Sequence, residues 1–299
     1  MEHEQPRVVA VVVAYDSARW LPACLEALDR QGVPIIVVDN ASSDGTAAVA
    51  RNAGARVIAN DKNEGYGRGN NQGIRAAEGA DWCMIVNPDA VLDTDCVRLL
   101  LDGARRHSHA GIVVPKLLEP DGRSFEHSTS VLSRAAPIET GHVSQGERVV
   151  PFASGACMLV QRNAFLKIGG FDDNIFLFYE DDDLCLRIRQ AGFTIVQSDS
   201  AIARHARGGS SVPSPGRIFR SRWHQAWSRS YVCRKHGIAD DRIWVLIRNG
   251  LKLLGVLPTF NRRRIERYAG SVAGAWAALR NQAAIERERL AARGLSTRT

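Results

Sequence analysis

Long apolar runs are missing from this sequence of 299 residues. No stretch approaches the roughly 18 consecutive apolar residues of a membrane-spanning helix. The apolar run from Val8 to Ala14 is also too short for the core of a signal peptide followed by a cleavage site. We therefore expect a protein that is neither exported nor inserted across a membrane.

Cysteine pairs at metal-binding or redox spacing are missing as well. The six cysteines are scattered, none forms a CxxC pair, and most lie within apolar segments. That pattern is typical of reduced, buried thiols, so we expect a cytoplasmic protein. With 45% hydrophobic and 24% charged residues, the chain has the composition of an ordinary globular protein, and its length allows one large domain or two modest ones.

Acidic residues are scarce only in the C-terminal part. Residues 205–299 carry 19 Lys and Arg against 5 Asp and Glu, a balance of +14, whereas the whole chain has a net charge of +7. This asymmetry favours two parts with different partners: a domain over residues 1–212 and a basic helical region over residues 213–299. The basic region suggests an anionic surface. Phospholipid is favoured over nucleic acid, because no base-stacking platform or recognition motif accompanies the charge.

Buried β-branched strands alternate with amphipathic helices in the first part of the chain, which is typical of an α/β fold with a mainly parallel sheet and helices on both faces. We predict strands at 8–13, 34–38, 56–59, 82–86, 112–114, 155–160, 194–197 and 201–204, and helices at 18–29, 46–53, 68–77, 95–106 and 162–168, with C-terminal helices at 217–236, 242–257 and 262–293. Residues 118–148 are irregular and polar, with at most two short hairpin-like pieces, and we assign them no role.

Polar residues follow four of the predicted strands. They are Tyr15 and Asp16, then Asp39 and Asn40, then the segment 60–71, then Asn87, Pro88 and Asp89. Ligands of such sheets bind beyond the carboxyl ends of the strands, so these four loops are expected to converge on one cleft. Asp39 is placed to accept a hydrogen bond from a base or ribose, although a simple Asx or Ser turn closed by Gly45 also accounts for part of its loop.

The segment Gly65–Gly73 is dense in glycine and precedes a helix. Glycines there would let backbone amides approach a diphosphate, and a flexible turn is the alternative interpretation. The spacing matches neither the GxGxxG nor the Walker fingerprint, which disfavours a dinucleotide site.

Two further segments carry candidate metal ligands. Asn87-Pro88-Asp89 resembles a reduced DxD element with one carboxylate, which suffices to help hold a divalent cation that keeps several waters. His205, at the end of a predicted strand, could supply a neutral nitrogen, and the Gly-Ser segment 207–211 that follows would face phosphate. The alternatives are a Pro-Asp turn and an ordinary surface histidine.

Four consecutive acidic residues, 180–183, open a helical pattern that continues with Leu184 and Ile188. Amide dipoles at a helix N-terminus favour anions, so we expect an ionised Asp there that can accept a proton or help hold a cation. Ordinary helix caps are the alternative. In the C-terminal region, the apolar residues of 244–256 are interleaved with Arg248 and Lys252, which favours either a membrane surface or a helical appendage with a solvated basic side.

Six segments in order resemble the inverting family 2 glycosyltransferases of GT-A fold, most closely bacterial rhamnosyltransferases and related galactofuranosyltransferases. They span about residues 8–210 and are Val11–Tyr15, Val37–Thr46, Asn63–Gly67, Asn87–Asp89, Gly169–Asp172 and Tyr179–Leu184. Asn87 departs from the family's full DxD, which has a carboxylate at that position.

The resemblance implies roles for individual residues. Asp39 would accept the pyrimidine N3–H, residues Ala14 to Asp16 would line the nucleoside, and the 63–71 loop would lie near the diphosphate. Asp89 and His205 would hold Mg²⁺ or Mn²⁺ there, and Asp181 would be the base that deprotonates the acceptor. The implied donor-binding set is Ala14, Tyr15, Asp16, Asp39, Asn40, Asn63, Gly65, Asn70, Asn71, Asn87 and Pro88, with Glu180 supporting catalysis and Glu180 and Asp183 positioning the acceptor.

The resemblance implies transfer of a sugar, with rhamnose from dTDP-rhamnose favoured, to a cell-envelope glycan or a polyprenyl-linked acceptor at the inner face of the plasma membrane. A transferase that uses a UDP-sugar, such as a galactofuranosyltransferase, stays open. So does a metal-dependent nucleotide phosphohydrolase that uses Asp89, Asp181 and His205, and so does a non-catalytic nucleotide-sugar sensor or basic binding protein. The oligomeric state does not follow from the sequence.

Overall fold

The computed structural model describes residues 6–125, 130–136, 142–144, 146–206, 216–285 and 287–288. Contacts divide the chain into two compact units. The first, which we call the sheet unit, comprises residues 1–171 and 181–212, and the second, the helical unit, comprises residues 172–180 and 213–299. Unlike the predicted division, residues 172–180 group with the C-terminal helices.

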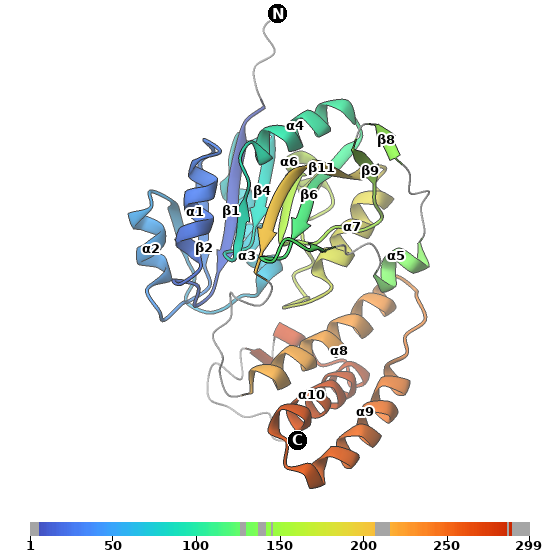
Figure 1. Ribbon diagram of the computed structural model, residues 1–299. Coiled ribbons are helices and arrows are strands. Elements are labelled where there is room, and N and C mark those ends of the chain that lie inside the picture. Colours follow the sequence, from blue (N-terminus) through green and yellow to red (C-terminus); the bar gives the residue numbers. More distant parts are fainter. Residues whose placement is uncertain are drawn as a thin grey trace, which may run out of the picture. The chain divides into compact units, whose positions relative to one another are not determined.

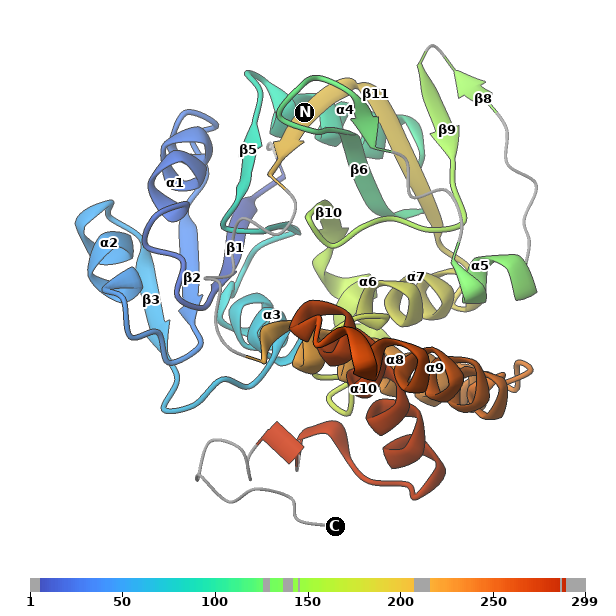
Figure 2. The ribbon, with the colours of Figure 1, turned by 60° about the horizontal axis from the view of Figure 1, so that its bottom comes forward.

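One sheet organises the first unit (Figures 1 and 2). Its strands lie in the order β3-β2-β1-β4-β10-β6-β11-β9-β8, with β5 paired to β11 and β7 to β6. Strands β3, β2, β1 and β4 are mutually parallel and β11 is parallel to β6, whereas β10 runs antiparallel between β4 and β6. The bounds are β1 Val8–Ala14, β2 Ile35–Asp39, β3 Arg56–Ala59, β4 Trp82–Val86, β5 Ala90–Leu92, β6 Ala110–Leu118, β7 Ser124–Phe125, β8 His142–Ser144, β9 Glu147–Val149, β10 Cys157–Gln161 and β11 Thr194–His205.

Helices cover both faces of this sheet, because the central strands are apolar on both sides. Ala10 and Val12 of β1 pack in the core formed with α1 (Leu21–Asp29), α2 (Thr46–Asn52) and α4 (Cys96–Arg106). Val11 and Val13 of the same strand pack in the opposite core with α3 (Tyr66–Ala76), α6 (Arg162–Lys167) and α7 (Glu180–Gln190). The predicted α/β architecture with a mixed, mainly parallel sheet is confirmed.

Several predicted boundaries are wrong. The two strands expected at 194–197 and 201–204 form one strand, β11, with a register shift between Ser198 and Ile202. Strand β5 was not expected, because three residues give too short a pattern to recognise. The irregular segment 118–148 contributes β7, β8, β9 and a short helix, α5 (Val131–Ala135), and parts of it lie outside the described residues.

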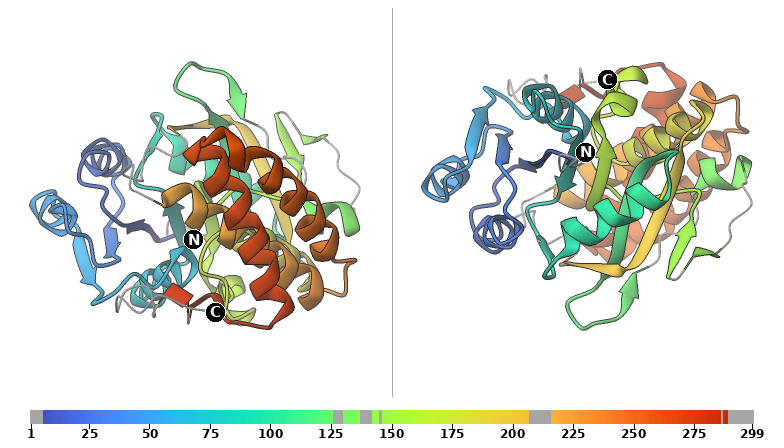
Figure 3. Two further views of the ribbon diagram at one scale, coloured as in Figure 1. Left: turned by 90° about the horizontal axis from the view of Figure 1, so that it is seen from below. Right: turned by 90° about the horizontal axis from the view of Figure 1, so that it is seen from above.

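The helical unit contains α8 (Arg217–Lys235), α9 (Arg242–Val256), the 3₁₀ turn η1 (Leu257–Thr259) and α10 (Arg262–Leu279) (Figure 3). The last helix was predicted to reach residue 293, but it ends at Leu279, and Asn281 has a φ of 53° that a helix cannot continue through. Within the part of the chain that the structure describes, no helix has both the length and the apolar character needed to cross a bilayer.

Two glycines let α10 pack closely on α8. A Cβ atom at Gly270 would lie 2.3 Å from the carbonyl oxygen of Phe219, and one at Gly274 would lie 2.2 Å from that of Trp223. Both obstacles are backbone atoms, which cannot rotate away. The spacing of four residues places both glycines on the same face of α10, so this face is in backbone contact with α8.

We expect Gly274→Ala to destabilise the helical unit by about 1–3 kcal/mol, because the new methyl group forces the two helix backbones apart. Hydrogen exchange measured by mass spectrometry should speed up in peptides of α8 and α10. Gly250→Ala is the matched control, since a Cβ there meets nothing within 4 Å, and a helical Ala in open space should be neutral or stabilising. Equal exchange in the two variants would contradict the close packing.

Candidate active site

The loops after β1 and β2 are joined to each other. Ala14 pairs with Asp39 in the parallel register, and the amide of Asn40 donates to the carbonyl of Ala14 at 2.8 Å. Asp16, with a φ of 46°, accepts from the amide of Ser43 at 2.8 Å. Tyr15 is 40% exposed beside this junction. The structure therefore brings together five of the residues predicted to bind the donor: Ala14, Tyr15, Asp16, Asp39 and Asn40.

Some side chains at this junction hold the loops together, and others are candidates for direct contact with a nucleoside. The carboxylate of Asp16 is used to hold the loop after β2, and the amide of Asn40 is buried, where it donates to the carbonyl of Gly65 at 3.1 Å. Asp39 is 5% exposed and one of its oxygens accepts weakly from the amide of Ser42 at 3.3 Å. Asp39 and Tyr15 are therefore the better candidates for direct contact with a nucleoside.

The third loop is tied to this junction through amides. Asn60 donates to the side-chain oxygen of Asn40 at 2.9 Å, and Asn63 accepts from the amide of Gly65 at 2.9 Å. Gly65 precedes α3 with φ 89° and ψ 171°, a conformation essentially restricted to glycine. Asn63 and Gly65 thus lie in a turn that is joined to the end of β2 through Asn40.

The remaining glycines of this segment have another role than the one predicted. Helix α3 begins at Tyr66, so Gly67, Gly69 and Gly73 are helical, and Cβ atoms on them would lie 2.9 Å from Phe171, 2.7 Å from Val13 and 2.3 Å from Val11. They let the helix approach the sheet closely and do not form a backbone cradle for a diphosphate. The predicted helix began at residue 68, two residues late, which left Gly67 in the loop, and Gly69 and Gly73 were assigned to the same glycine-dense segment although they fall within the predicted helix.

The two asparagines of α3 point into the core as well. Asn71 is 1% exposed, and its amide exchanges two 2.9 Å hydrogen bonds with the backbone of Phe171. Asn70 is fully buried and donates to the carbonyl of Tyr66 at 3.0 Å. Both side chains are buried and hydrogen-bonded within the sheet unit. The direct contacts with a nucleotide-sugar donor that were predicted for Asn70 and Asn71 therefore do not fit this conformation.

Asp89 and His205 lie together at the end of β4. Nε2 of His205 is 3.2 Å from Oδ1 of Asp89 and 3.4 Å from Nδ2 of Asn87. The cause is strand β5, which follows Pro88-Asp89 and pairs with the end of β11, so that Ala90 is opposite His205. The amide of Ala206 also donates to the carbonyl of Asp89 at 3.1 Å. The Gly-Ser segment 207–211, expected to face phosphate, lies outside the described residues.

The oxygen of Asp89 and the nitrogen of His205 fit a divalent cation whose remaining ligands are substrate phosphates and waters. Asp89 offers a carboxylate that is 4% exposed, and His205 offers an imidazole nitrogen. Among the described residues, no group of three or more His, Cys, Asp or Glu side chains could hold a metal. Mg²⁺ typically keeps several waters and binds through one or two protein ligands plus substrate phosphates, which is what two side chains allow.

Asp181 stands in the first turn of α7 against Gly155. The amide of Gly155 donates to Oδ2 of Asp181 at 2.8 Å, and the hydroxyl of Tyr66 donates to the carbonyl of Gly155 at 2.6 Å. A Cβ at residue 155 would lie 2.3 Å from Oδ1 of Asp181, so only glycine fits. Oδ1 of Asp181 is buried, and it has no hydrogen-bond partner in the described part of the chain.

Asp181, the candidate base, lies at the same ends of the sheet strands as Asp89 and His205, the candidate cation ligands. Asp181 accepts a hydrogen bond from the amide of Gly155, and the carbonyl of the next residue, Ala156, accepts from the amide of Asn87 at 2.9 Å. Asn87 in turn contacts His205. The three side chains predicted to act together, Asp89, His205 and Asp181, are therefore linked through two adjacent residues at the start of β10.

Burial raises the pKa of two acids at the start of α7. Burial raises the pKa of Asp181 to about 7, the neighbouring Asp182 carboxylate adds to the rise, and the hydrogen bond from Gly155 lowers it. Burial likewise raises the pKa of Asp182 to about 6, against a lowering hydrogen bond from Ser130. The expectation that the dipole keeps these acids fully ionised is wrong for Asp181. A base with a pKa near 7 is well matched to proton transfer at neutral pH.

Asp183 and Glu180, which were predicted to position the acceptor, are both buried. Asp183 is fully buried, Nε of Arg187 donates to its Oδ2 at 2.7 Å, and Arg187 also donates to the carbonyl of Ile168 at 3.0 Å. That arrangement anchors α7, so direct contact between Asp183 and an acceptor does not fit this conformation. Glu180 is 6% exposed at the start of the same helix.

The backbone just before the acids is strained. Phe178 and Tyr179 both have a φ of 67°, which costs a non-glycine residue of order 1–3 kcal/mol. In the helical unit the preceding residues are held firmly, with Asp172 paired to Lys235 at 2.6 Å and the carbonyl of Leu177 accepting from Ser228 at 2.9 Å. Strained backbone of this kind clusters at active sites, which agrees with a catalytic role for the adjacent Asp181.

Sequence reasoning missed Gly155 and Tyr66. Gly155 was assigned to a buried strand, but β10 starts at Cys157, and the preceding turn carries the amide that binds Asp181. A glycine directly before a buried strand was the available signal, since glycine there often marks close approach of another group. No local pattern identified Tyr66, because its partner is 89 residues away.

Comparison with known proteins agrees with this geometry. Residues 9–169 match the model of glycosyl transferase family 2. The N-acetylglucosaminyl-diphospho-decaprenol L-rhamnosyltransferase of Mycobacterium tuberculosis is 30% identical over 263 residues, covering 74% of this chain and 86% of that protein. The dTDP-rhamnosyl transferase RfbF of Shigella flexneri is 25% identical over 216 residues, covering 69% and 71%.

Among solved structures, the mannosyltransferase PcManGT of Pyrobaculum calidifontis, in complex with GDP-Man and Mn²⁺, superimposes with a TM-score of 0.57. The match covers 93% of this chain and 88% of that one at 16% identity, a level that informs on the fold alone. The fold is that of GT-A enzymes. By the family match, by its relatives and by this fold, the chain belongs to the family 2 glycosyltransferases and is an enzyme of that class.

Proposed function

We propose that this glycosyltransferase moves rhamnose from dTDP-rhamnose to a lipid-linked saccharide of the cell envelope, with inversion at the anomeric carbon. The observation that carries the proposal is the position of Asp181, a half-buried residue with a pKa of about 7, at the same ends of the sheet strands as Asp89 and His205. The choice of sugar, nucleotide and acceptor is supported by the relatives, whose names specify rhamnose, dTDP and a diphospho-decaprenol acceptor.

In the proposed reaction, Asp181 accepts the proton of the acceptor hydroxyl while that oxygen attacks the anomeric carbon opposite the leaving dTDP. Gly155 orients the carboxylate, and the uncommitted Oδ1 is the oxygen that would take the proton. Asp39 binds the thymine through its N3–H, next to Tyr15. The junction between the loops after β1 and β2 keeps these two residues in place before the donor arrives.

Mg²⁺ or Mn²⁺ is the proposed cofactor. Asp89 and His205 would hold it, with Asn87 beside them, and when bound it would neutralise negative charge on the donor diphosphate. The solved PcManGT structure, which has Mn²⁺, supports the use of a divalent cation in this fold.

We also propose that the enzyme acts in the cytoplasm at the inner face of the plasma membrane. Helix α9 exposes an apolar stripe that includes Trp244 at 60%, Leu251 at 66% and Leu254 at 65% exposure. These side chains recur on one face of the helix, and large exposed apolar residues with nearby basic ones are typical of helices that lie in the bilayer interface. An acceptor with a long lipid would be presented at that surface.

The proposal is tested by incubating the enzyme and Mg²⁺ with dTDP-rhamnose, with and without a diphosphate-linked saccharide acceptor. A rhamnosyltransferase releases dTDP much faster when the acceptor is present, and its product carries the inverted linkage. Release at the same rate without acceptor would instead identify a nucleotide-sugar hydrolase. UDP-galactofuranose is the control donor, and preferential turnover of it would replace rhamnose in the proposal.

A further inference from the structure

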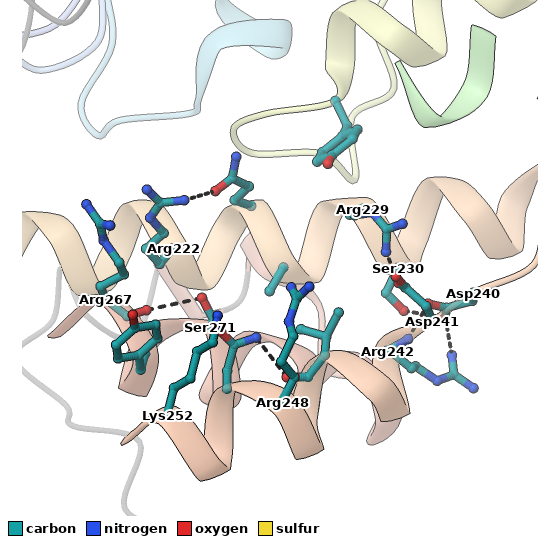
Figure 4. A pocket seen from close by; sticks show the side chains of 16 residues that line it. Arg222, Arg229, Ser230, Asp240, Asp241, Arg242, Arg248, Lys252, Arg267 and Ser271 are labelled. Atoms are coloured by element: carbon teal, nitrogen blue, oxygen red, sulfur yellow. Dashed lines mark hydrogen bonds and ion pairs between the residues drawn. The ribbon is translucent and has the colours of Figure 1, made fainter. Parts of the chain in front are cut away.

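A cavity of about 470 Å³ lies within the helical unit, between α8, α9 and α10 (Figure 4). Its volume is in the range of about 300–1,000 Å³ that is usual for small-ligand sites. Basic side chains reach it from all three helices: Arg222 and Arg229 from α8, Arg242, Arg248 and Lys252 from α9, and Arg267 from α10. Nothing in the donor site or the proposed chemistry uses this cavity.

Only part of this positive charge is neutralised locally. Asp240 pairs with Arg242 at 3.0 Å, and Asp241 pairs with Arg229. These are the two carboxylates among the residues that line the cavity. Both carboxylates therefore form ion pairs with arginines at one end of the cluster of basic side chains.

Four cations remain without a carboxylate partner among the described residues: Arg222, Arg248, Lys252 and Arg267. Within the described residues, Arg222 donates to the amide oxygen of Gln225 at 2.7 Å, and Lys252 lies 5.9 Å from the centre of the Tyr268 ring. Arg222 is half-buried, whereas Arg248, Lys252 and Arg267 are exposed, and all four line this one concavity. Their mutual repulsion favours binding of an anion with more than one negative charge.

The ligand chemistry follows from the side chains. Guanidinium groups bind phosphate oxygens through paired N–H donors, and a lysine adds a point charge. A singly charged phospholipid headgroup would leave most of the excess charge in place, whereas a diphosphate ester carries at least two negative charges. We propose that this pocket binds the diphosphate group of an isoprenoid-diphosphate-linked acceptor. The inference rests on the proposed function, because it assigns a site to the acceptor class named there.

Binding of geranyl diphosphate, measured by calorimetry, tests the pocket directly. Saturating dTDP and a chelator are added, so that the donor site and its cation do not contribute. The double variant Arg248→Gln/Lys252→Gln should bind about 100-fold more weakly, since each lost charged hydrogen bond is worth about tenfold or more. The variant should keep its melting temperature, because neither residue has an ion-pair partner in the described part of the chain.

The matched control is Arg263→Gln/Arg264→Gln. It removes the same charge from exposed positions in the first turn of α10, outside the cavity, and should leave the affinity within about threefold. Equal weakening in both double variants would show nonspecific charge attraction and overturn the proposal. So would the absence of geranyl diphosphate binding to the unaltered protein.

Two further arms identify the source of the phosphate. Vesicles of phosphatidylglycerol should bind the pocket variant and the control variant equally. If only the pocket variant loses vesicle binding while geranyl diphosphate binding is unchanged, the pocket serves a phospholipid and the proposal is wrong. In the transfer assay, the pocket variant should show a KM for the diphosphate-linked acceptor raised by about tenfold or more. Because binding is measured without turnover, a failure of the transferase assay and a failure of the pocket give different results.

Discussion

Replacing Asp181 with Asn is expected to lower kcat for sugar transfer by roughly 10²–10⁴-fold, the contribution of a general base, while the affinity for the dTDP donor stays nearly unchanged. The amide oxygen can still accept from Gly155, so the geometry of the turn is kept, but the side chain no longer takes up a proton. Initial rates with saturating acceptor, together with calorimetric titration of dTDP, measure the two quantities separately. An equal loss of donor affinity would show that Asp181 binds the nucleotide instead.

The matched control is Asp182→Asn, the same change one residue along the helix. Asp182 contacts Ser130 and raises the pKa of Asp181 through its charge. The variant should retain activity within about tenfold. Its effect should appear in the pH profile: kcat/KM rises with pH as Asp181 loses its proton, with a midpoint near 7 in the unaltered protein, and removal of the neighbouring charge should move that midpoint to lower pH.

Stability distinguishes loss of the base from loss of the fold. The folded-state pKa of Asp181 lies above its ordinary value of 3.8, so the folded protein binds more protons than the unfolded chain between about pH 4 and 7. Stability contributed by this group therefore falls as pH rises through that window. Asn has no charge to bury, so Asp181→Asn should be at least as stable as the unaltered protein at pH 8, although its kcat is greatly reduced.

Much of the sheet unit could be predicted from local patterns. Continuous apolar runs rich in valine, such as Val8–Val13, identify strands buried on both faces, and their alternation with helices gives a parallel arrangement that brings the loops after β1 and β2 together. The meeting of Asp89 and His205 could not be derived that way. That contact was predicted from the family resemblance. Its structural cause is the pairing of β5 with β11, and a strand of three residues is too short to be recognised from the sequence.

The functions of individual side chains were harder to predict, because burial is set by distant residues. Gly69 and Gly73 looked like a phosphate loop, yet Val13 and Val11 occupy the space their side chains would need. Asn71 looked like a donor ligand, yet it holds the backbone of Phe171, 100 residues away. The pKa of Asp181 depends in the same way on burial beside Gly155, which no local pattern reveals.

Asp89→Asn is expected to lower kcat/KM by at least about 10²-fold, because a cation that offsets diphosphate charge supplies several kcal/mol of transition-state stabilisation. The amide keeps the shape of the carboxylate and removes the charge that would hold Mg²⁺ or Mn²⁺ next to His205. Activity measured against Mn²⁺ concentration should show a higher half-saturating concentration and partial recovery with excess ion. In the unaltered protein, a chelator should abolish transfer, and added Mn²⁺ should restore it.

The same two strands provide the control. Asp93 follows β5 and pairs with Arg204 of β11 at 3.0 Å, one residue before His205, but this ion pair is at the surface, where such pairs are worth about 0–1 kcal/mol. Asp93→Asn should therefore leave both the rate and the dependence on Mn²⁺ within about threefold. If the two variants behave alike, or if the unaltered enzyme is fully active in chelator, Asp89 and His205 only join β5 to β11. The charge of the leaving dTDP would then have to be offset by groups other than this pair.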